Sequence, residues 1–157
     1  MIEKGQTAPD FTLPRDGGGT VTLSELQGAP IVLYFYPKDD TSGCTREAQD
    51  FTEAANAFKA AGCTVLGVSK DTVAKHDKFR EKHDLGITLL SDAEGNVCET
   101  YGTWVEKSMY GRKYMGVERS TYLIDREGRI AECWRKVKVP GHAQSVLDAT
   151  KALQSGR

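Results

Sequence analysis

The chain has 157 residues and a formal net charge of −1, and 39% of its residues are hydrophobic while 27% are charged. These values are typical of one soluble globular domain and argue against a disordered or fibrous chain. With 21 basic and 22 acidic residues there is no overall basic field, so we expect neither nucleic acid nor a membrane as partner. No apolar run reaches the roughly 20 residues of a membrane helix, and the start lacks a secretory-signal pattern. We therefore predict a cytoplasmic protein with a single domain over residues 1–157.

The first half of the chain predicts a hairpin and then a βαβ unit. A β-hairpin is predicted around the glycine run at 17–19. The continuous apolar run at 31–36 ends at Pro37 and predicts a central strand that is buried on both faces. Apolar side chains at helical spacing predict a helix over 44–60, and a second strand follows at 64–68.

The second half continues with alternating elements after an initial polar helix. The predicted elements are a helix at 72–83, a strand at 87–90, a short helix near 94–101, two strands at 121–124 and 130–137 joined by a hairpin turn, and an amphipathic helix at 143–153. The stretch between 102 and 120 is predicted to be irregular. This order predicts an α/β domain of thioredoxin-like fold, with a central mixed β-sheet flanked by helices and an N-terminal β-hairpin.

Cys44 is the residue whose position indicates chemistry. It lies beyond the C-terminal end of the predicted central strand and in the first turn of the next helix, where open α/β sheets bind their ligands. Free backbone N–H groups and the positive end of the helix dipole favour a thiolate there, so we predict a nucleophilic cysteine. The alternative is a buried packing cysteine, which the Asp-, Thr-, Ser- and Gly-rich loop disfavours because it predicts no apolar pocket.

The residues around Cys44 resemble a known family. The spacing Pro37-x-x-x-Thr41-x-x-Cys44 resembles the active-site pattern of the peroxiredoxins, in which a thiolate attacks the O–O bond of a peroxide. Three longer blocks are similar to the subfamily called bacterioferritin comigratory protein or PrxQ: 32–41, 109–116 and 119–125. The resemblance extends over nearly the whole chain, from about residue 5 to residue 153.

The resemblance implies a thiol-dependent peroxidase that reduces hydrogen peroxide and organic hydroperoxides through a sulfenic acid at Cys44, without a metal or other cofactor. Thr41 would place its hydroxyl on the peroxide oxygens, and Pro37 would fix the loop and shield it from water. Arg119 would stabilise the thiolate and the leaving oxygen; the alternative for Arg119 is a solvated pair with Glu118. The resemblance also implies a monomer that is recycled by thioredoxin, glutaredoxin or glutathione.

Four other polar residues have predicted roles of a structural kind. Glu47 suits the first turn of the helix, where a carboxylate complements the dipole and can orient an arginine. His76 and His83 are predicted at the surface, and His142 at the start of the last helix. The spacing of the histidines from the cysteines predicts no tetrahedral metal site.

The thiol that resolves the sulfenic acid is left open by the sequence. Many relatives carry a second cysteine five residues after Cys44 or near 79–80, but this chain has Gln49 at the first place and no cysteine at the second. The remaining thiols are Cys63, Cys98 and Cys133. Topology favours Cys98 as the resolving partner, because it follows a strand that ends at the same sheet edge as Cys44, although a disulfide requires Cα atoms within roughly 7 Å. The alternative is a one-cysteine enzyme resolved by an external thiol.

Two other interpretations of the same fold come from different functional classes. A disulfide oxidoreductase of the thioredoxin type normally needs a Cys-x-x-Cys pair, which the sequence around Cys44 lacks. A binding module without catalysis predicts a cysteine of ordinary reactivity at position 44.

Overall fold

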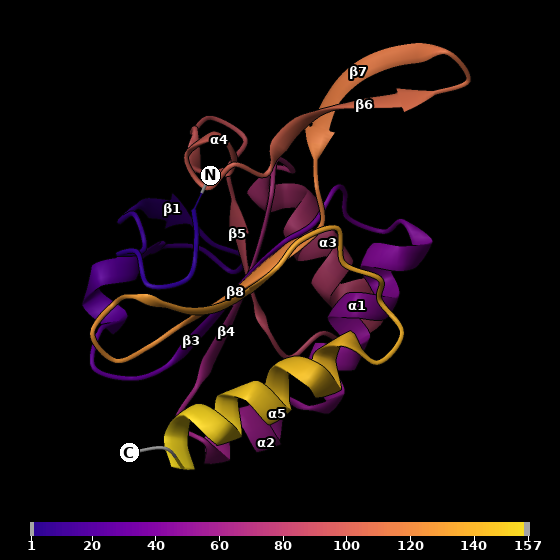
Figure 1. Ribbon diagram of the computed structural model, residues 1–157. Coiled ribbons are helices and arrows are strands. Elements are labelled where there is room, and N and C mark those ends of the chain that lie inside the picture. Colours follow the sequence, from indigo (N-terminus) through magenta and orange to yellow (C-terminus); the bar gives the residue numbers. More distant parts are fainter. Residues whose placement is uncertain (1, 156–157) are drawn as a thin grey trace.

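The computed structural model describes residues 2–155, and its centre is a sheet of five strands in the order β5-β4-β3-β8-β9 (Figure 1). β3 is parallel to β4, and β4 to β5, whereas β8 and β9 are antiparallel to their neighbours. The strands are β3 (Ile31–Phe35), β4 (Thr64–Ser69), β5 (Thr88–Ser91), β8 (Ser120–Ile124) and β9 (Ile130–Trp134). The prediction of a mixed central sheet flanked by helices is confirmed.

The helices lie close to their predicted positions, with one difference. They are η1, a 3₁₀ turn (Leu23–Leu26), α1 (Ser42–Glu53), α2 (Ala55–Ala60), α3 (Val73–His83), α4 (Val97–Thr100) and α5 (His142–Ser155). The single helix predicted over 44–60 is divided at Ala54, whose ψ of 0° turns the chain. The turn lets Phe51 of α1 and Phe58 of α2 face one core, with ring centroids 5.9 Å apart.

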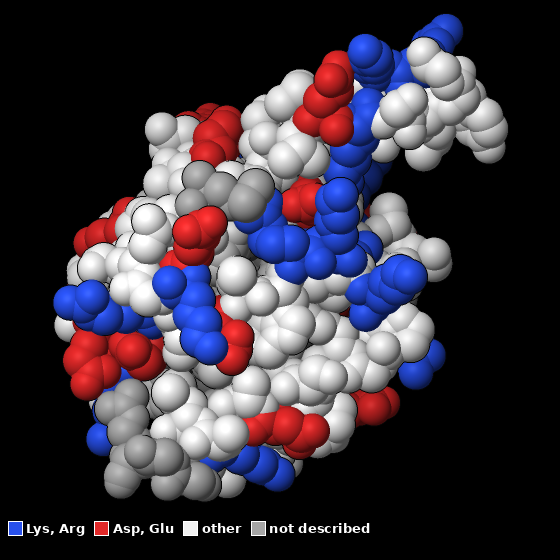
Figure 2. Space-filling model, in the orientation of Figure 1, with Lys and Arg blue, Asp and Glu red and all other residues white. Residues whose placement is uncertain are grey.

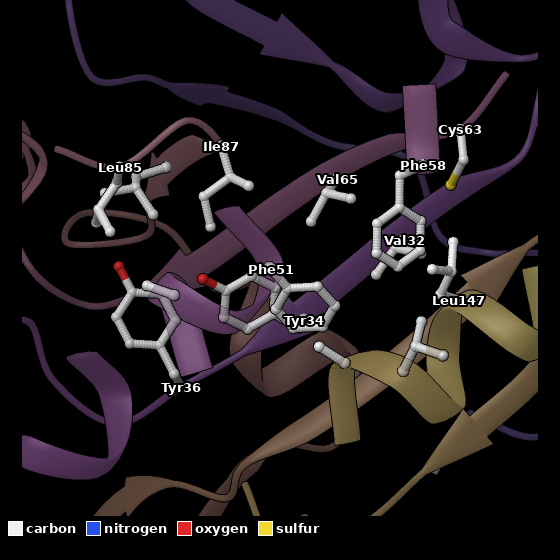
Figure 3. Close-up of a cluster of buried hydrophobic side chains, with 14 of the residues drawn as sticks. Val32, Tyr34, Tyr36, Phe51, Phe58, Cys63, Val65, Leu85, Ile87 and Leu147 are labelled. Atoms are coloured by element: carbon white, nitrogen blue, oxygen red, sulfur yellow. The ribbon is translucent and has the colours of Figure 1, made fainter. Parts of the chain in front are cut away.

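Each face of the sheet is covered by its own hydrophobic core. The buried side chains of β3 alternate between the two cores, as the pleat of a strand requires. The first core lies against α1, α2, α3 and α5, and Figure 3 shows its aromatic centre, where Tyr34 stacks on Phe51 at 4.7 Å. The second core lies under the N-terminal segment and α4. A residue of α1 and a residue of α4 therefore lie on opposite faces of the sheet.

Two small hairpins lie outside the central sheet. β1 (Thr12–Pro14) pairs with β2 (Thr20–Thr22), which confirms the N-terminal hairpin. β6 (Trp104–Met109) pairs with β7 (Arg112–Val117), and we call this projecting hairpin the arm (Figure 1). The prediction of an irregular stretch over 102–120 is therefore wrong. Because most of the arm is exposed on both faces, its strands lack the alternation of apolar and polar residues by which strands are recognised.

The sheet brings distant parts of the chain to one edge. The C-terminal end of β3 leads into the loop at 37–41 and then into α1. In the antiparallel register of β8, Ser120 is paired with Phe35, so Arg119 is placed beside the end of β3. No helix among residues 2–155 is long and apolar enough to cross a membrane.

Candidate active site

Cys44 and Arg119 meet at this edge of the sheet, 75 positions apart in the sequence. The Nη2 group of Arg119 donates to the Sγ atom of Cys44 at 3.3 Å. The guanidinium thus presents a permanent positive charge to the sulfur, which can stabilise negative charge that develops there during a reaction. The structure thus unites two of the residues that the family pattern singled out, and the alternative for Arg119 fails because Glu118 pairs with Arg135 instead.

Glu47 holds the guanidinium in place. Its Oε1 atom accepts from Nη1 of Arg119 at 2.6 Å, and the carboxylate is almost completely buried. Burial raises the pKa of Glu47 to about 7, although the positive charge of Arg119 acts in the opposite direction. The second oxygen, Oε2, has no hydrogen-bond partner among the described residues. The Glu47 carboxyl group is therefore an orienting group for Arg119 that can exchange a proton near neutral pH.

The thiol is more buried than the sequence predicts. Cys44 is 1% exposed and belongs to the first core, so the prediction that its loop offers no apolar pocket is wrong. The reason is helical geometry: Cys44, Glu47, Ala48 and Phe51 follow the i, i+3, i+4, i+7 spacing and form the buried face of α1. That spacing is present in the sequence and was the signal from which the burial of Glu47 could be predicted.

Thr41 and Pro37 occupy the loop in front of the thiol. Thr41 is the residue before α1, and its exposed hydroxyl donates to the carbonyl oxygen of Lys38 at 2.9 Å. Pro37 is half-buried at the end of β3. Both residues lie on the segment that leads to Cys44, but the structure shows no hydrogen bond from either of them to its sulfur.

Asp39 of the same loop contacts His76 of α3 inside the protein. The prediction that His76 lies at the surface is wrong, because its side chain is completely buried. Its Nδ1 atom lies 2.6 Å from Oδ2 of Asp39, and its Nε2 atom donates to the carbonyl oxygen of Leu90 at 2.8 Å. Burial opposes a charge on the ring, but the contacts with Asp39 and Leu90 prevail and raise the pKa of His76. His76 and Phe79 are three positions apart on the buried side of α3, which was the available signal.

Asp39, Asp71 and His76 form a buried polar cluster. It is the only group of three or more His, Cys, Asp or Glu residues among residues 2–155 whose side chains have the spacing of metal ligands. Ligand atoms of Asp39, Asp71 and His76 lie within 4.8 Å of one another. Their oxygens and ring nitrogens already accept or donate internal bonds, including those from the hydroxyls of Tyr36 to Asp39 and of Ser69 to Asp71, both at 2.6 Å. The cluster is therefore a satisfied hydrogen-bond network that fixes the loop rather than a set of free ligands.

The other three cysteines are free thiols apart from this site. Cys98 is completely buried in the second core, on the opposite face of the sheet from Cys44, and burial raises its pKa. Cys133 packs against that same core. Cys63 precedes β4, at the opposite end of the parallel strands from Cys44, and burial raises its pKa to about 12. The structure thus brings none of the three to Cys44.

Comparison with known proteins gives one consistent family. The profile of the AhpC/TSA family matches residues 4–133. The chain is 52% identical to a putative peroxiredoxin bcp of Coxiella burnetii, over 93% of this chain and 97% of that one, and 50% identical to peroxiredoxin Bcp of Bacillus subtilis, over 97% of each.

Solved structures agree with this match. A structure of the bacterioferritin comigratory protein of Xanthomonas campestris, described as an intermediate and ligand complex bearing on alkyl peroxide reduction, has a TM-score of 0.89, 42% identity and 98% coverage of both chains. A cysteine-to-serine mutant of PrxQ from Xylella fastidiosa has a TM-score of 0.92, 40% identity and 97% coverage of both chains. The chain therefore belongs to the AhpC/TSA family, as a thiol-dependent peroxidase of the Bcp or PrxQ group of peroxiredoxins.

Proposed function

We propose that this chain reduces hydrogen peroxide and organic hydroperoxides at Cys44, as a cytoplasmic monomer whose single domain spans residues 1–157. The observation that carries the assignment of Cys44 is its 3.3 Å contact with the Arg119 guanidinium at the start of α1. None of the other three thiols has a hydrogen bond or ion pair to an arginine among the described residues.

In the proposed reaction, the Cys44 thiolate attacks one oxygen of the peroxide. The S–O bond forms as the O–O bond breaks, and the second oxygen leaves with the bonding electrons and takes a proton to become water or an alcohol. Arg119 stabilises the thiolate and the charge that develops on the leaving oxygen, while Glu47 keeps the guanidinium in place. The hydroxyl of Thr41 exchanges its bond with the Lys38 carbonyl for one with the peroxide.

Access to the sulfur requires movement of the loop, because Cys44 is buried in the structure. The loop and the first turn of α1 are joined to the core by polar contacts of Asp39 and Arg119, whereas the side chains of Lys38 and Thr41 are exposed and the Thr41 hydroxyl bonds within the loop, to the Lys38 carbonyl. We propose that a small displacement of this segment admits the peroxide.

The product, Cys44 sulfenic acid, is proposed to be reduced by an external thiol of the thioredoxin, glutaredoxin or glutathione type. The position of Cys98 on the opposite face of the sheet supports this proposal over an internal disulfide. An internal Cys44–Cys98 bond is the competing proposal, and it requires unwinding of both α1 and α4.

The test is the mass of the intact protein after one equivalent of peroxide, followed by peptide mapping. We expect one added oxygen on Cys44 and no intramolecular disulfide, and the same result in Cys98→Ser. Loss of two hydrogens with a Cys44–Cys98 linkage would contradict the external-thiol step. Cys44→Ser is expected to lose peroxidase turnover, and Cys63→Ser, a control of equal chemistry, to retain it.

A further inference from the structure

The arm is the most exposed apolar feature of the described residues. It consists of β6, β7 and the turn at 110–111, and Figure 1 shows it standing away from the body of the molecule. All the large hydrophobic side chains that are strongly exposed among residues 2–155 lie on it, and Tyr110 is 99% exposed: Met109, Tyr110, Tyr114 and Met115. A two-stranded hairpin has little stability of its own in water. An exposed apolar feature of this kind marks a surface that binds a partner.

The turn of the arm supports this interpretation independently. Tyr110 has a φ of 51° and Gly111 a φ of 77°, so both central residues are in the left-handed region. Asn, Asp or Gly is the usual residue at the first of these positions, because a bulky side chain there is strained. An aromatic residue at the tip thus costs stability without packing against any part of the described chain.

One face of the arm combines apolar and basic side chains. Residues directly opposite in an antiparallel pair lie on the same face, and Lys107 is opposite Tyr114 while Met109 is opposite Arg112. Neither Arg112 on this face nor Lys113, which lies opposite Ser108 on the other face, has an acidic partner among residues 2–155. Figure 2 shows Lys and Arg side chains along the arm with an acidic side chain beside them, and uncharged side chains at its end.

This face borders the active site. At the base of the arm, the Lys107 ammonium group donates to the carbonyl oxygen of Val117, two residues before Arg119 in the chain. On the other side of Arg119, its carbonyl oxygen accepts a bond from the N–H of Val137 at 3.0 Å, which places the loop at 136–138 there with two more exposed lysines. A molecule that reaches Cys44 from this side meets a rim of positive charge.

We propose that the arm is the docking element for the protein that reduces oxidised Cys44, and that this partner presents an acidic surface with apolar side chains around a reactive dithiol. The inference rests on the proposed function. Tyr, Met and Arg, which are among the exposed residues of the arm, are enriched at the centres of protein interfaces. Unpaired cations on the arm complement acidic groups on the partner and speed its association.

A lipid surface fits the arm less well. A segment that lies in the membrane interface gathers its apolar side chains on one face, whereas Met109 and Tyr114 lie on one face of the arm and Met115 lies on the other. The chain as a whole is also slightly negative, with a net charge of −1.

The chemistry of the docked step balances with a dithiol partner. One partner thiolate attacks the sulfur of the Cys44 sulfenic acid, an S–S bond forms, and the hydroxyl leaves as water after taking a proton. The second thiol of the partner then attacks the partner sulfur of this mixed disulfide. The bond to Cys44 breaks, the Cys44 thiolate is released, and the two partner sulfurs are left joined as a disulfide.

The test compares a protein reductant with a small uncharged one. Peroxidase turnover is measured with thioredoxin, its reductase and NADPH, with glutaredoxin and glutathione, and with dithiothreitol. The arm variants are Tyr110→Gly, which retains the positive φ of the turn, and Arg112→Glu combined with Lys113→Glu. The matched control is Lys59→Glu combined with Lys151→Glu, which changes the net charge equally on the exposed surfaces of α2 and α5.

We expect both arm variants to lower kcat/KM for the preferred protein reductant about tenfold or more, with unchanged rates in dithiothreitol. The control variant is expected to have the same kcat/KM as the wild type. Added salt is expected to lower the rate of the wild type with the protein reductant more steeply than the rate of the variant with Arg112→Glu and Lys113→Glu. Equal rates for arm variants and wild type, or an equal fall with dithiothreitol, would overturn the proposal. So would a wild-type protein that neither protein reductant recycles faster than dithiothreitol.

Two further measurements separate other occupants of the arm. Sedimentation that shows a wild-type dimer lost in the arm variants, with unchanged thioredoxin rates, would assign the arm to a second copy. Arm-dependent binding to vesicles of phosphatidylcholine and phosphatidylglycerol, again with unchanged rates, would assign it to lipid. Both results contradict the proposal. Absence of any turnover with dithiothreitol in the wild type would instead contradict the peroxidase assignment itself.

Discussion

At the scale of single residues, the site depends on how one guanidinium is shared. Arg119 donates to Cys44 through Nη2 and to Glu47 through Nη1, so the plane of its guanidinium is fixed by two contacts. A cation that serves a buried thiolate must be held within a fraction of an ångström to stabilise charge at the reacting sulfur. The backbone leaves space for this arrangement at Gly43, beside which the guanidinium lies.

Gly43→Ala tests this spacing. A Cβ atom at position 43 would lie 3.1 Å from Nη2 of Arg119, which is closer than an ordinary contact, so the guanidinium must move by a few tenths of an ångström. We expect the second-order rate constant with hydrogen peroxide to fall about tenfold, or about 1.4 kcal/mol. The Tm should not fall, since Ala favours the helix. Gly86→Ala, where the Cβ would make an ordinary 3.4 Å contact with Thr52, is the control; equal rates for all three proteins would refute the prediction.

At the scale of elements, the loop at 37–41 is held by α3 as well as by its own helix. Asp39 binds His76 inside the protein, and Asp40, with a φ of 62°, binds Lys82 and His83 at the surface at 2.7 and 2.8 Å. The internal contact is shielded from water and the external ones are not, so the internal one contributes more to the position of the loop.

His76→Phe is therefore expected to destabilise the protein by about 3 kcal/mol, because Asp39 loses its partner inside the core. The folded-state pKa of His76 is raised, so the pair contributes fully below pH about 6.5 and its contribution is lost as the pH rises through the folded value. Denaturant unfolding at acidic and alkaline pH should show this loss in the wild type and not in the variant. His83→Phe is the control, with an expected effect below about 1 kcal/mol. An equal effect of both substitutions would disprove the larger contribution of the internal contact.

At the scale of the whole molecule, α5 closes the first core through His142. The ring packs edge-on against Phe51 and Trp134, and its Nε2 atom lies 2.7 Å from the hydroxyl of Thr121. The contacts join α5 to α1, β8 and β9. Burial, with a smaller effect of the Arg119 cation, lowers the pKa of His142 to about 4.

The protein is expected to lose stability in acid for this reason. In the unfolded chain His142 takes up a proton near pH 6.5, whereas in the folded protein it does so only near pH 4, so the free energy of unfolding falls between these values by at most about 3 kcal/mol. Unfolding measured at pH 7 and pH 4.5 should show a smaller fall in His142→Asn than in the wild type. An identical fall in both proteins would exclude His142 as the cause.

The sequence by itself determined the parts of this protein that depend on neighbouring residues. The run at 31–36 and the helical spacing after Cys44 specify a strand followed by a helix, and this order places the thiol at a helix start. The same local pattern contains Cys44 and Glu47 on the buried face of α1, although the loop composition suggested an open site. Local periodicity thus determines these elements and the position of Cys44, the proposed nucleophile, at the helix start.

Only the tertiary structure decided which distant residues surround that thiol. Strand register places Arg119 at the end of β3, and packing of α3 under the loop buries His76 against Asp39. The faces of the sheet separate Cys98 from Cys44, which a count of cysteines cannot show. The arm is held by its own strand pairing, without a buried face to mark it in the sequence. The contacts of Arg119, the pairing of His76 with Asp39 and the separation of the two cysteines involve residues far apart along the chain, so no local pattern of side chains encodes them.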